Sequence, residues 1–181
     1  MDIQKLKFPI GEYVPNRNPD KELLSKWIKE IEDFPAKLEN LTKGISLEKL
    51  NWNYRPGGWT VKQVIHHCAD SHMNSLIRFK LALTEDTPVI RPYREDKWAE
   101  LLDAQDNNIE NSIKLLFGLH RRWVILLRNL SDEQLELEFI HPEHAKRFNL
   151  AEVIGNYAWH CNHHLAHVKN GLESNGKYNR D

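Results

Sequence analysis

The stretch LAEVIGNYAWHCNHHLAHVKN, residues 150–170, has the clearest structural pattern in the chain. Its apolar residues recur at the spacing of one helix face, which predicts a helix that begins after Asn149 and ends near Asn170. Four of the ten histidines of the chain lie in its second half. The same stretch therefore predicts a long packed helix and raises the question of a metal site. The apolar stripe consists of Leu150, Val153, Tyr157, Cys161 and Val168.

Further helices are predicted on both sides of the middle of the chain. Thr60 is a favourable N-cap for a helix that runs to about Leu83. Asp20 can cap a helix that Pro35 kinks or breaks, with helical character resuming over 36–41. A third helical region covers roughly 97–130, with an irregularity near QDNNIENS (105–112). Ser131 and Gln134 have capping-box spacing, which predicts a short helix there.

Length and composition fit one domain over residues 1–181. Of the 181 residues 40% are hydrophobic and 28% charged, as in globular proteins. Alternation typical of strands is scarce, so we expect an all-α fold, and four long helices most simply form a bundle. Residues 1–19 are rich in proline near their end and are predicted to form an extended N-terminal arm rather than a helix.

Charge and hydropathy exclude several classes of function. The net charge of −1 lacks the basic excess of a nucleic-acid binder. No apolar run reaches the roughly 18 residues of a membrane span. The N-terminus has no apolar core of a signal peptide, and two cysteines do not make a disulfide framework. We therefore expect a cytoplasmic protein that acts on a small molecule, with neither nucleic acid nor membrane as partner.

His160 and His164 are the natural pair of metal ligands in the last helix. They are spaced i, i+4 and lie on or beside the apolar stripe, so both can point at one ion. His167 lies further round the helix, and His163 is expected to face away from the core. A zinc protease helix would read H-E-x-x-H, but Cys161 stands where the glutamate should be, so that class is not supported.

A third ligand should come from VIHHCADSH, residues 64–72. His72 falls on the apolar centre of its helix, His67 on one flank and His66 near the opposite flank. Periodicity favours His72 as the inward residue. It does not decide the ligand, because each helix of a bundle buries two flanks.

Several segments resemble one known family over nearly the whole chain. RPGGWTVKQVIHHCADSHMNSLIRFKLALTE (55–85) and WHCNHHLAH (159–167) are similar to the DinB superfamily, and within it to the YfiT group of metal-dependent hydrolases, which includes bacillithiol transferase. FPIGEY (8–13), RPY (91–93) and LHRRWVILLRNLSDEQ (119–134) fit the same group. The resemblance implies an up-down-down-up four-helix bundle with one divalent metal ion per chain. By position it assigns the ligands to His67, His160 and His164, which makes His72 a core residue or a support behind a ligand.

Three neutral imidazoles would leave the ion with an open position, where water or a thiol could be ionised. Hydrolysis and a bacillithiol-type thiol S-transfer, with a low-molecular-weight thiol as partner, therefore both remain open. A third possibility is a non-enzymatic metal-binding stress protein. Its site would be closed by a fourth ligand from His163, His167 or Cys68. Zinc or nickel is the expected metal, although histidine-only sites also suit copper and iron.

Other residues are weaker candidates. Tyr54, Trp59, Arg91 and Tyr93 adjoin loops that could rim a substrate pocket, and Arg91 could hold a carboxylate or be a plain surface residue. Two carboxylates, those of Asp70 and Glu152, could orient a ligand histidine through its other nitrogen. His141 and His144 lie in IHPEHAKRF (140–148), which is predicted to be a solvated loop. Finally, the arm needs a surface to lie on, which together with the resemblance predicts a homodimer.

Overall fold

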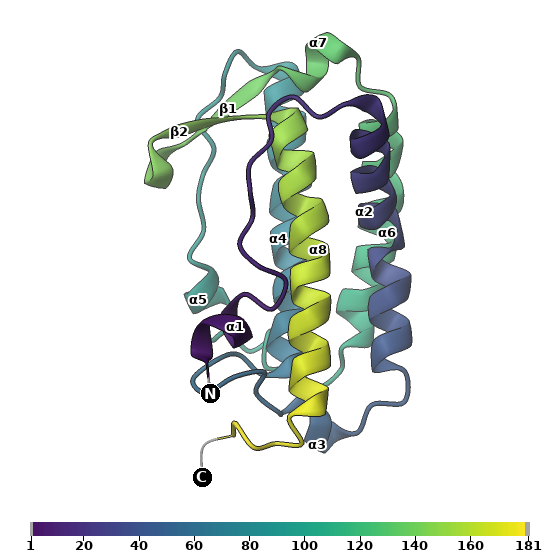
Figure 1. Cartoon of the computed structure of the whole chain (residues 1–181), viewed down its shortest axis with the longest axis vertical. Helices are drawn as coiled ribbons and strands as arrows, with labels where there is room; N and C mark the ends of the chain where they lie inside the picture. Colours follow the sequence, from purple (N-terminus) through teal and green to yellow (C-terminus); the bar gives the residue numbers. More distant parts are fainter. Residues whose placement is uncertain (1, 180–181) are drawn as a thin grey trace.

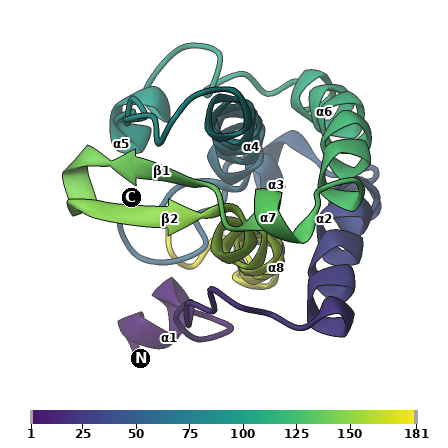
Figure 2. The same cartoon turned by 90° about the horizontal axis from the view of Figure 1, so that it is seen from above.

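The computed structural model describes residues 2–179, and its centre is a bundle of four long helices. In Figure 1, α2 and α8 run downward while α4 and α6 run upward, so the predicted up-down-down-up topology is confirmed. Both α2 and α4 pack against α6 and against α8, which leaves α2 and α4 on one diagonal of the square seen in Figure 2. The four helices are α2 (Lys21–Thr42), α4 (Val61–Thr84), α6 (Glu110–Arg128) and α8 (Leu150–Glu173).

The long helices begin at the predicted caps. The side chain of Asp20 accepts from the backbone N–H of Leu23 at 2.8 Å, and Thr60 forms a reciprocal capping box with Gln63. The side chain of Asn149 accepts from the backbone of the first turn of α8. Short polar side chains at these positions satisfy backbone donors that a helix start leaves free, which is why local sequence locates them.

Pro35 does not break its helix, so of the two predicted effects, a kink or a break, the break is wrong. Helix α2 continues through this residue to Thr42. Proline has no N–H to give to the carbonyl four residues earlier, which here belongs to Ile31. The Nδ1 of His120 on α6 lies 2.6 Å from that carbonyl oxygen and takes the place of the missing donor. A tertiary hydrogen bond thus compensates for the local defect.

The region predicted as one helical stretch over 97–130 is divided. A short helix, α5 (Glu95–Trp98), is followed by turns, and α6 begins only at Glu110. The predicted capping box at Ser131 is present and starts α7 (Asp132–Leu135). One other short helix, α3 (Leu47–Leu50), lies in the connection between α2 and α4.

The segment predicted as a loop around residue 140 is a β-hairpin. Strands β1 (Glu138–His141) and β2 (Lys146–Asn149) pair antiparallel, with a 3₁₀ turn over Pro142–His144 between them. His141 is half-buried in β1 and its ring packs near that of Phe148, so it is not a plain surface residue. The side chain of His144 lies outside the described part. Short strands with no clear alternation gave no signal for this hairpin.

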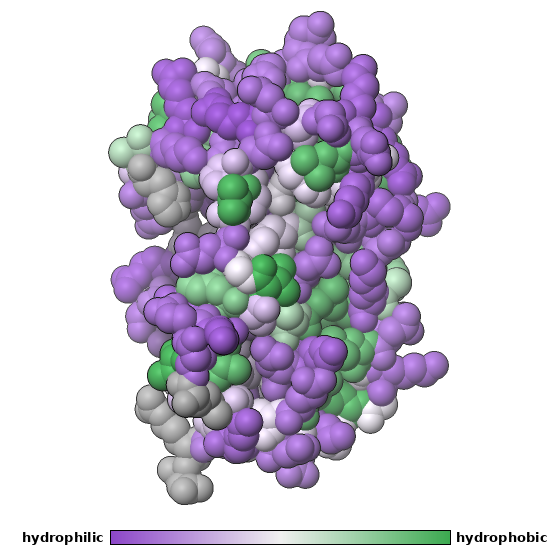
Figure 3. All heavy atoms as spheres, viewed as in Figure 1, coloured by the Kyte–Doolittle hydropathy of each residue, from purple (hydrophilic) through white to green (hydrophobic). Residues whose placement is uncertain are grey.

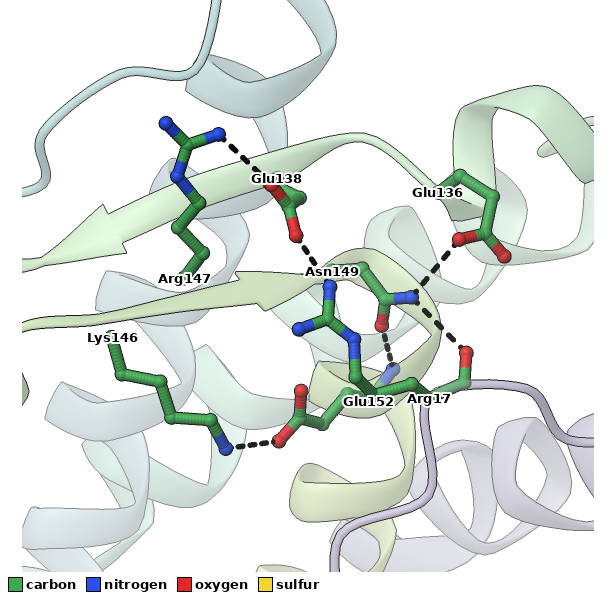
Figure 4. Close-up of polar contacts among 7 residues, drawn as sticks. All are labelled: Arg17, Glu136, Glu138, Lys146, Arg147, Asn149 and Glu152. Atoms are coloured by element: carbon green, nitrogen blue, oxygen red, sulfur yellow. Dashed lines mark hydrogen bonds and ion pairs between the residues drawn. The ribbon is translucent and has the colours of Figure 1, made fainter.

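Polar contacts connect the hairpin to the N-terminal end of α8 and to the arm (Figure 4). The guanidinium groups of Arg17 and Arg147 bond the same carboxylate, that of Glu138. Lys146 contacts the buried carboxylate of Glu152 at 2.7 Å, and Asn149 donates to the backbone carbonyl of Arg17 at 3.1 Å. This network holds the end of the arm against the start of α8.

The N-terminal arm lies along α8 of its own chain (Figures 1 and 2). It contains a short helix, α1 (Ile3–Lys7), that was not predicted and that Asp2 caps. Trp159 donates to the carbonyl of Gly11 at 3.1 Å, and the hydroxyl of Tyr13 donates to the carbonyl of Glu152 at 2.8 Å. The arm therefore finds its surface within the monomer.

The predicted homodimer now rests on the family resemblance alone, because the arm does not need a partner chain. We still expect light scattering at micromolar concentration to give twice the 21.4 kDa mass of one chain. A mass of one chain that does not change across a concentration series would contradict the prediction.

In the view of Figure 3, hydrophilic side chains cover most of the surface, and hydrophobic side chains gather in smaller groups between them, most visibly below and to the right of the centre. Among the described helices none combines the length and apolar character needed to span a bilayer.

Candidate metal centre

Three histidines meet at the seam between α4 and α8. His67 lies in the second turn of α4, and His160 and His164 lie one turn apart on α8. One nitrogen from each of the three lies within 4.8 Å of the other two. Within residues 2–179, no other group of three or more histidine, cysteine or acidic side chains has this arrangement. The structure thus brings together the three residues that the resemblance assigned, and His72 is not among them.

The donor set fits a divalent metal ion. Imidazole nitrogens bound to zinc lie about 2.0–2.1 Å from it in a tetrahedral arrangement, so two of them are roughly 3.3–3.4 Å apart. Small side-chain movements would therefore close the group around one ion. Three neutral nitrogens and no carboxylate suit zinc, nickel, copper or iron, and the geometry does not choose among them.

Burial keeps these imidazoles in the form that binds metal. Removal from water lowers the pKa of His67 to about 4, with a further contribution from nearby His163. The pKa values of His160 and His164 also lie well below the usual value, first because of burial and then because of neighbouring imidazoles. Neutral imidazole is the ligand form, so the site needs no proton release near neutral pH.

The three histidines line a cavity of about 370 Å³. Tyr54 and Trp59, both predicted at the rim, line it as well. Arg91 and Tyr93 are not among its lining residues: Arg91 is exposed, and Tyr93 is half-buried with its ring against that of Trp98. Sequence reasoning missed the other lining residues, which come from the arm, the 55–58 loop, α5 and α8: Lys7, Phe8, Arg55, Gly57, Gly58, Glu95, Trp159, His163 and His167.

His163 is buried, which corrects the prediction that it faces away from the core. Its ring stacks on Trp159 at a centroid distance of 4.3 Å and lies 6.0 Å from that of Phe8 in the arm. The arm, whose path the sequence pattern did not reveal, contacts this ring and contributes to its burial. His163 nevertheless stays outside the group of three.

Neither Asp70 nor Glu152 orients a ligand histidine. The carboxylate of Glu152 contacts Lys146 near the start of α8, and the side chain of Asp70 bonds none of the three ligands in the described structure. Two other histidines contact these imidazoles instead. His72 bonds Nδ1 of His160 at 3.0 Å, and His167 bonds Nδ1 of His164 at 3.3 Å.

We expect His160→Ala or His164→Ala to lose most of the bound metal, whereas His163→Ala keeps it. The first two each remove one of three ligands, while His163 contributes none to the group. Elemental analysis of the three purified variants measures this directly, with unfolding curves as the control for structure. Equal metal loss in all three would show that the register of α8 has been misread.

A four-helix bundle with a cavity floored by three neutral histidines defines a class of metal-dependent helical proteins. The family model of the DinB superfamily matches residues 30–168, and the chain belongs to that superfamily. It is 49% identical over 168 residues to a Bacillus subtilis protein named "Putative metal-dependent hydrolase YfiT", covering 93% of this chain and 94% of that protein. A Bacillus cereus (strain B4264) protein of the same description is 50% identical over 92% of this chain and 95% of its own length.

A solved structure shows the same architecture. The structure of YfiT from Bacillus subtilis, described as "a probable metal-dependent hydrolase with an unusual four-helix bundle topology", superposes with a TM-score of 0.89. It is 48% identical, and the match covers 91% of this chain and 94% of that one. The predicted family and fold are therefore confirmed.

Proposed function

We propose that this protein is a metal-dependent hydrolase of small molecules, with His67, His160 and His164 as metal ligands. The observation that supports it is the position of the three nitrogens, which lie together where the cavity meets the bundle. No fourth histidine, cysteine or carboxylate joins them among residues 2–179. A structural zinc site would normally have four protein ligands, so the donor set favours an open site.

A divalent ion bound there would lower the pKa of a bound water to about 7, or would bind a thiol in its deprotonated form. The protein's own residues supply the rest. Among residues 2–179, Glu95 is the one carboxylate that lines the cavity, and it can accept or return a proton. The arm and the 55–58 loop form walls beside the histidines and limit access of bulk water.

The cavity walls favour a substrate with an apolar body and an anionic group. Phe8, Trp59 and Trp159 supply aromatic surface, and Lys7 and Arg55 supply positive charge. The Arg55 guanidinium lies 5.3 Å from the ring centroid of Tyr54, which holds it at the rim. A volume of about 370 Å³ is that of a small-molecule site.

Thiol transfer is the second candidate, and the same observations bear on it. The two cations could bind the carboxylates of a low-molecular-weight thiol. No cysteine lines the cavity: Cys68 and Cys161 are buried in the core, and burial raises the pKa of both thiols. Any reacting thiol would therefore have to come from the substrate. A non-enzymatic metal protein is the third candidate, and the lack of a fourth ligand among the described residues disfavours it.

A panel assay of purified, metal-analysed protein separates the three. Esters and amides, some with a carboxylate group, are compared with small thiols offered together with monochlorobimane. We expect hydrolysis that a chelator abolishes and added metal restores, and an Arg55→Gln variant with higher KM on the anionic substrates. Turnover of the thiol pairs alone would replace hydrolysis by S-transfer. No turnover in a fully metal-loaded sample would leave the non-enzymatic alternative.

A further inference from the structure

A chain of imidazole rings leads from the metal site through the core of the bundle. Nδ1 of His160 lies 3.0 Å from Nε2 of His72, and Nδ1 of His72 lies 2.7 Å from Nε2 of His120. Nδ1 of His120 lies 2.6 Å from the carbonyl oxygen of Ile31. Both His72 and His120 are almost completely buried, at 0% and 2% exposure. The chain joins α8, α4, α6 and α2 in that order.

The carbonyl at its end sets the direction of every bond. A carbonyl oxygen only accepts, so Nδ1 of His120 must carry a proton. In the neutral state each imidazole ring has one N–H and one acceptor nitrogen. Nε2 of His120 is then an acceptor, which requires the proton of His72 on Nδ1. Nε2 of His72 is an acceptor in turn, which requires the proton of His160 on Nδ1.

Pro35 explains why the hydrogen bonds of this chain have one direction. In an ordinary helix the carbonyl of Ile31 would accept from the backbone N–H four residues later, but Pro35 has none. The carbonyl is buried and has to be satisfied by another donor, which His120 supplies. The proline within α2 therefore fixes which nitrogen of His120 is protonated.

A shorter chain of the same kind ends at the second ligand of α8. Nε2 of His167 lies 3.1 Å from the carbonyl oxygen of Lys7 in the arm, so this nitrogen carries the proton. Nδ1 of His167 must then accept from Nδ1 of His164, 3.3 Å away. The ring of His167 is held by stacking on Tyr54 at a centroid distance of 4.0 Å.

We propose that these two imidazole chains are positioning devices that fix His160 and His164 in the Nδ1–H tautomer, so that both present Nε2 to the metal. Each chain of imidazoles ends on a backbone carbonyl, that of Ile31 beside the helix proline or that of Lys7 in the docked arm. The position of this carbonyl therefore determines how the metal ligand at the other end is oriented. His72, His120 and His167 act through His160 and His164 and are positioning residues. The inference rests on the proposed metal site for its function, whereas the tautomers can be read in the metal-free protein.

The first test needs neither metal nor mutation. Long-range ¹H–¹⁵N correlation spectra of the metal-free protein near pH 7.5 distinguish the two neutral tautomers of each histidine. We expect the proton on Nδ1 in His72, His120, His160 and His164, and on Nε2 in His167. A proton on Nε2 of His160 or of His164 would overturn the proposal, whatever the outcome of the hydrolase assay.

The second test compares His72→Phe with His66→Phe. His66 is a matched control because it lies on the same helix, is also buried, and also bonds through both nitrogens, to Ser112 and to the carbonyl of Asp106. Metal affinity is measured by competition with a chelator. We expect a roughly 10- to 100-fold weaker affinity for His72→Phe, the usual cost of losing a group that orients a ligand. His66→Phe should stay within a factor of about three.

Unfolding curves of both variants report any general loss of structure. If His72→Phe is too unstable to study, His167→Phe tests the second chain with the same chelator competition and the same control. If the folded His72→Phe or His167→Phe variant binds metal no more weakly than His66→Phe, the positioning role is contradicted. A mixture of tautomers at His160 in metal-free His72→Phe would support it independently.

Discussion

His67→Ala abolishes stoichiometric metal binding, while His72→Ala keeps one metal per chain when metal is in excess. His67 offers one of the three nitrogens that lie within 4.8 Å of one another, and two histidines rarely hold a divalent ion alone. His72 lies behind His160, on the side of the ring that faces the core, and both of its nitrogens are already engaged. Any activity that depends on the metal should disappear with His67→Ala.

The cost of His72→Ala is expected mainly in stability, with weaker but complete metal loading. The side chain is fully buried between His120 and His160, so its removal leaves a cavity and unpaired ring nitrogens. The free energy of unfolding should fall by about 1–3 kcal/mol. Elemental analysis at saturating metal, together with denaturant unfolding of the metal-free variants, measures both effects. If His72→Ala strips the metal and His67→Ala leaves it bound, the assignment of the third ligand is wrong.

This pair also shows where periodicity stops being informative. The apolar stripe of α4 has His72 at its centre, and the structure indeed buries that residue completely. The group of three histidines, however, lies where two helices meet, and His67 on the flank of the stripe faces α8 across the seam. A hydrophobic stripe gives the direction of the core. It does not say at which depth, or between which two helices, a cavity opens.

The sequence predicted correctly those features that depend on neighbouring residues alone, such as the starts of the helices. The N-caps at Asp20, Thr60 and Asn149 lie where the sequence indicated, because the first turn of a helix needs acceptors for its free N–H groups. The continuity of α2 through Pro35 could not be predicted. It depends on His120, which is 85 residues further along the chain and whose position requires the packing of α2 against α6.

Most of the polar support of the site has the same long-range origin. His120 gave no sequence signal, since a single histidine in an amphipathic helix is usually an ordinary core or surface residue. His167 had a weak one, because it lies three residues after His164 on neighbouring faces. Its partner, the carbonyl of Lys7, is 160 residues away and depends on the path of the arm. The covering of His163 by Phe8 has the same cause.

As the pH is lowered, the metal-free protein should unfold at a pH well above about 4, where ordinary carboxylates titrate. Burial lowers the pKa of seven histidines, in several of them with help from neighbouring imidazoles: His67, His72, His120, His160, His163, His164 and His167. In the unfolded chain these groups have pKa values near 6.5. Between pH 6.5 and about 4 the unfolded state therefore binds more protons than the folded state, and stability falls as the pH falls.

The pH dependence of the histidines is large compared with the total stability of a domain. Each proton taken up on unfolding changes stability by about 1.4 kcal/mol per pH unit, so seven give a slope of up to roughly 10 kcal/mol per unit. The whole stability of a domain is typically about 5–15 kcal/mol. Asp70 and Glu95 oppose the trend, because burial raises the pKa of both carboxyl groups, that of Asp70 to about 6, so acid favours the folded state at these two positions. Two such groups cannot offset seven. Unfolding should be nearly complete between pH 6 and 4.5.

Circular dichroism and tryptophan fluorescence across a pH series at constant ionic strength measure the transition. Above pH 6.5 the histidine contribution is fully present, so stability there should be nearly independent of pH. Saturating metal binds only the folded state and should move the midpoint to lower pH, because it adds about 4 kcal/mol at a thousandfold excess over Kd. His163→Phe removes one of the seven groups and should also lower the midpoint. A metal-free protein that stays equally stable from pH 7 to 5 would show that the buried histidines take up protons without unfolding the bundle, against the pKa values that the fold imposes on them.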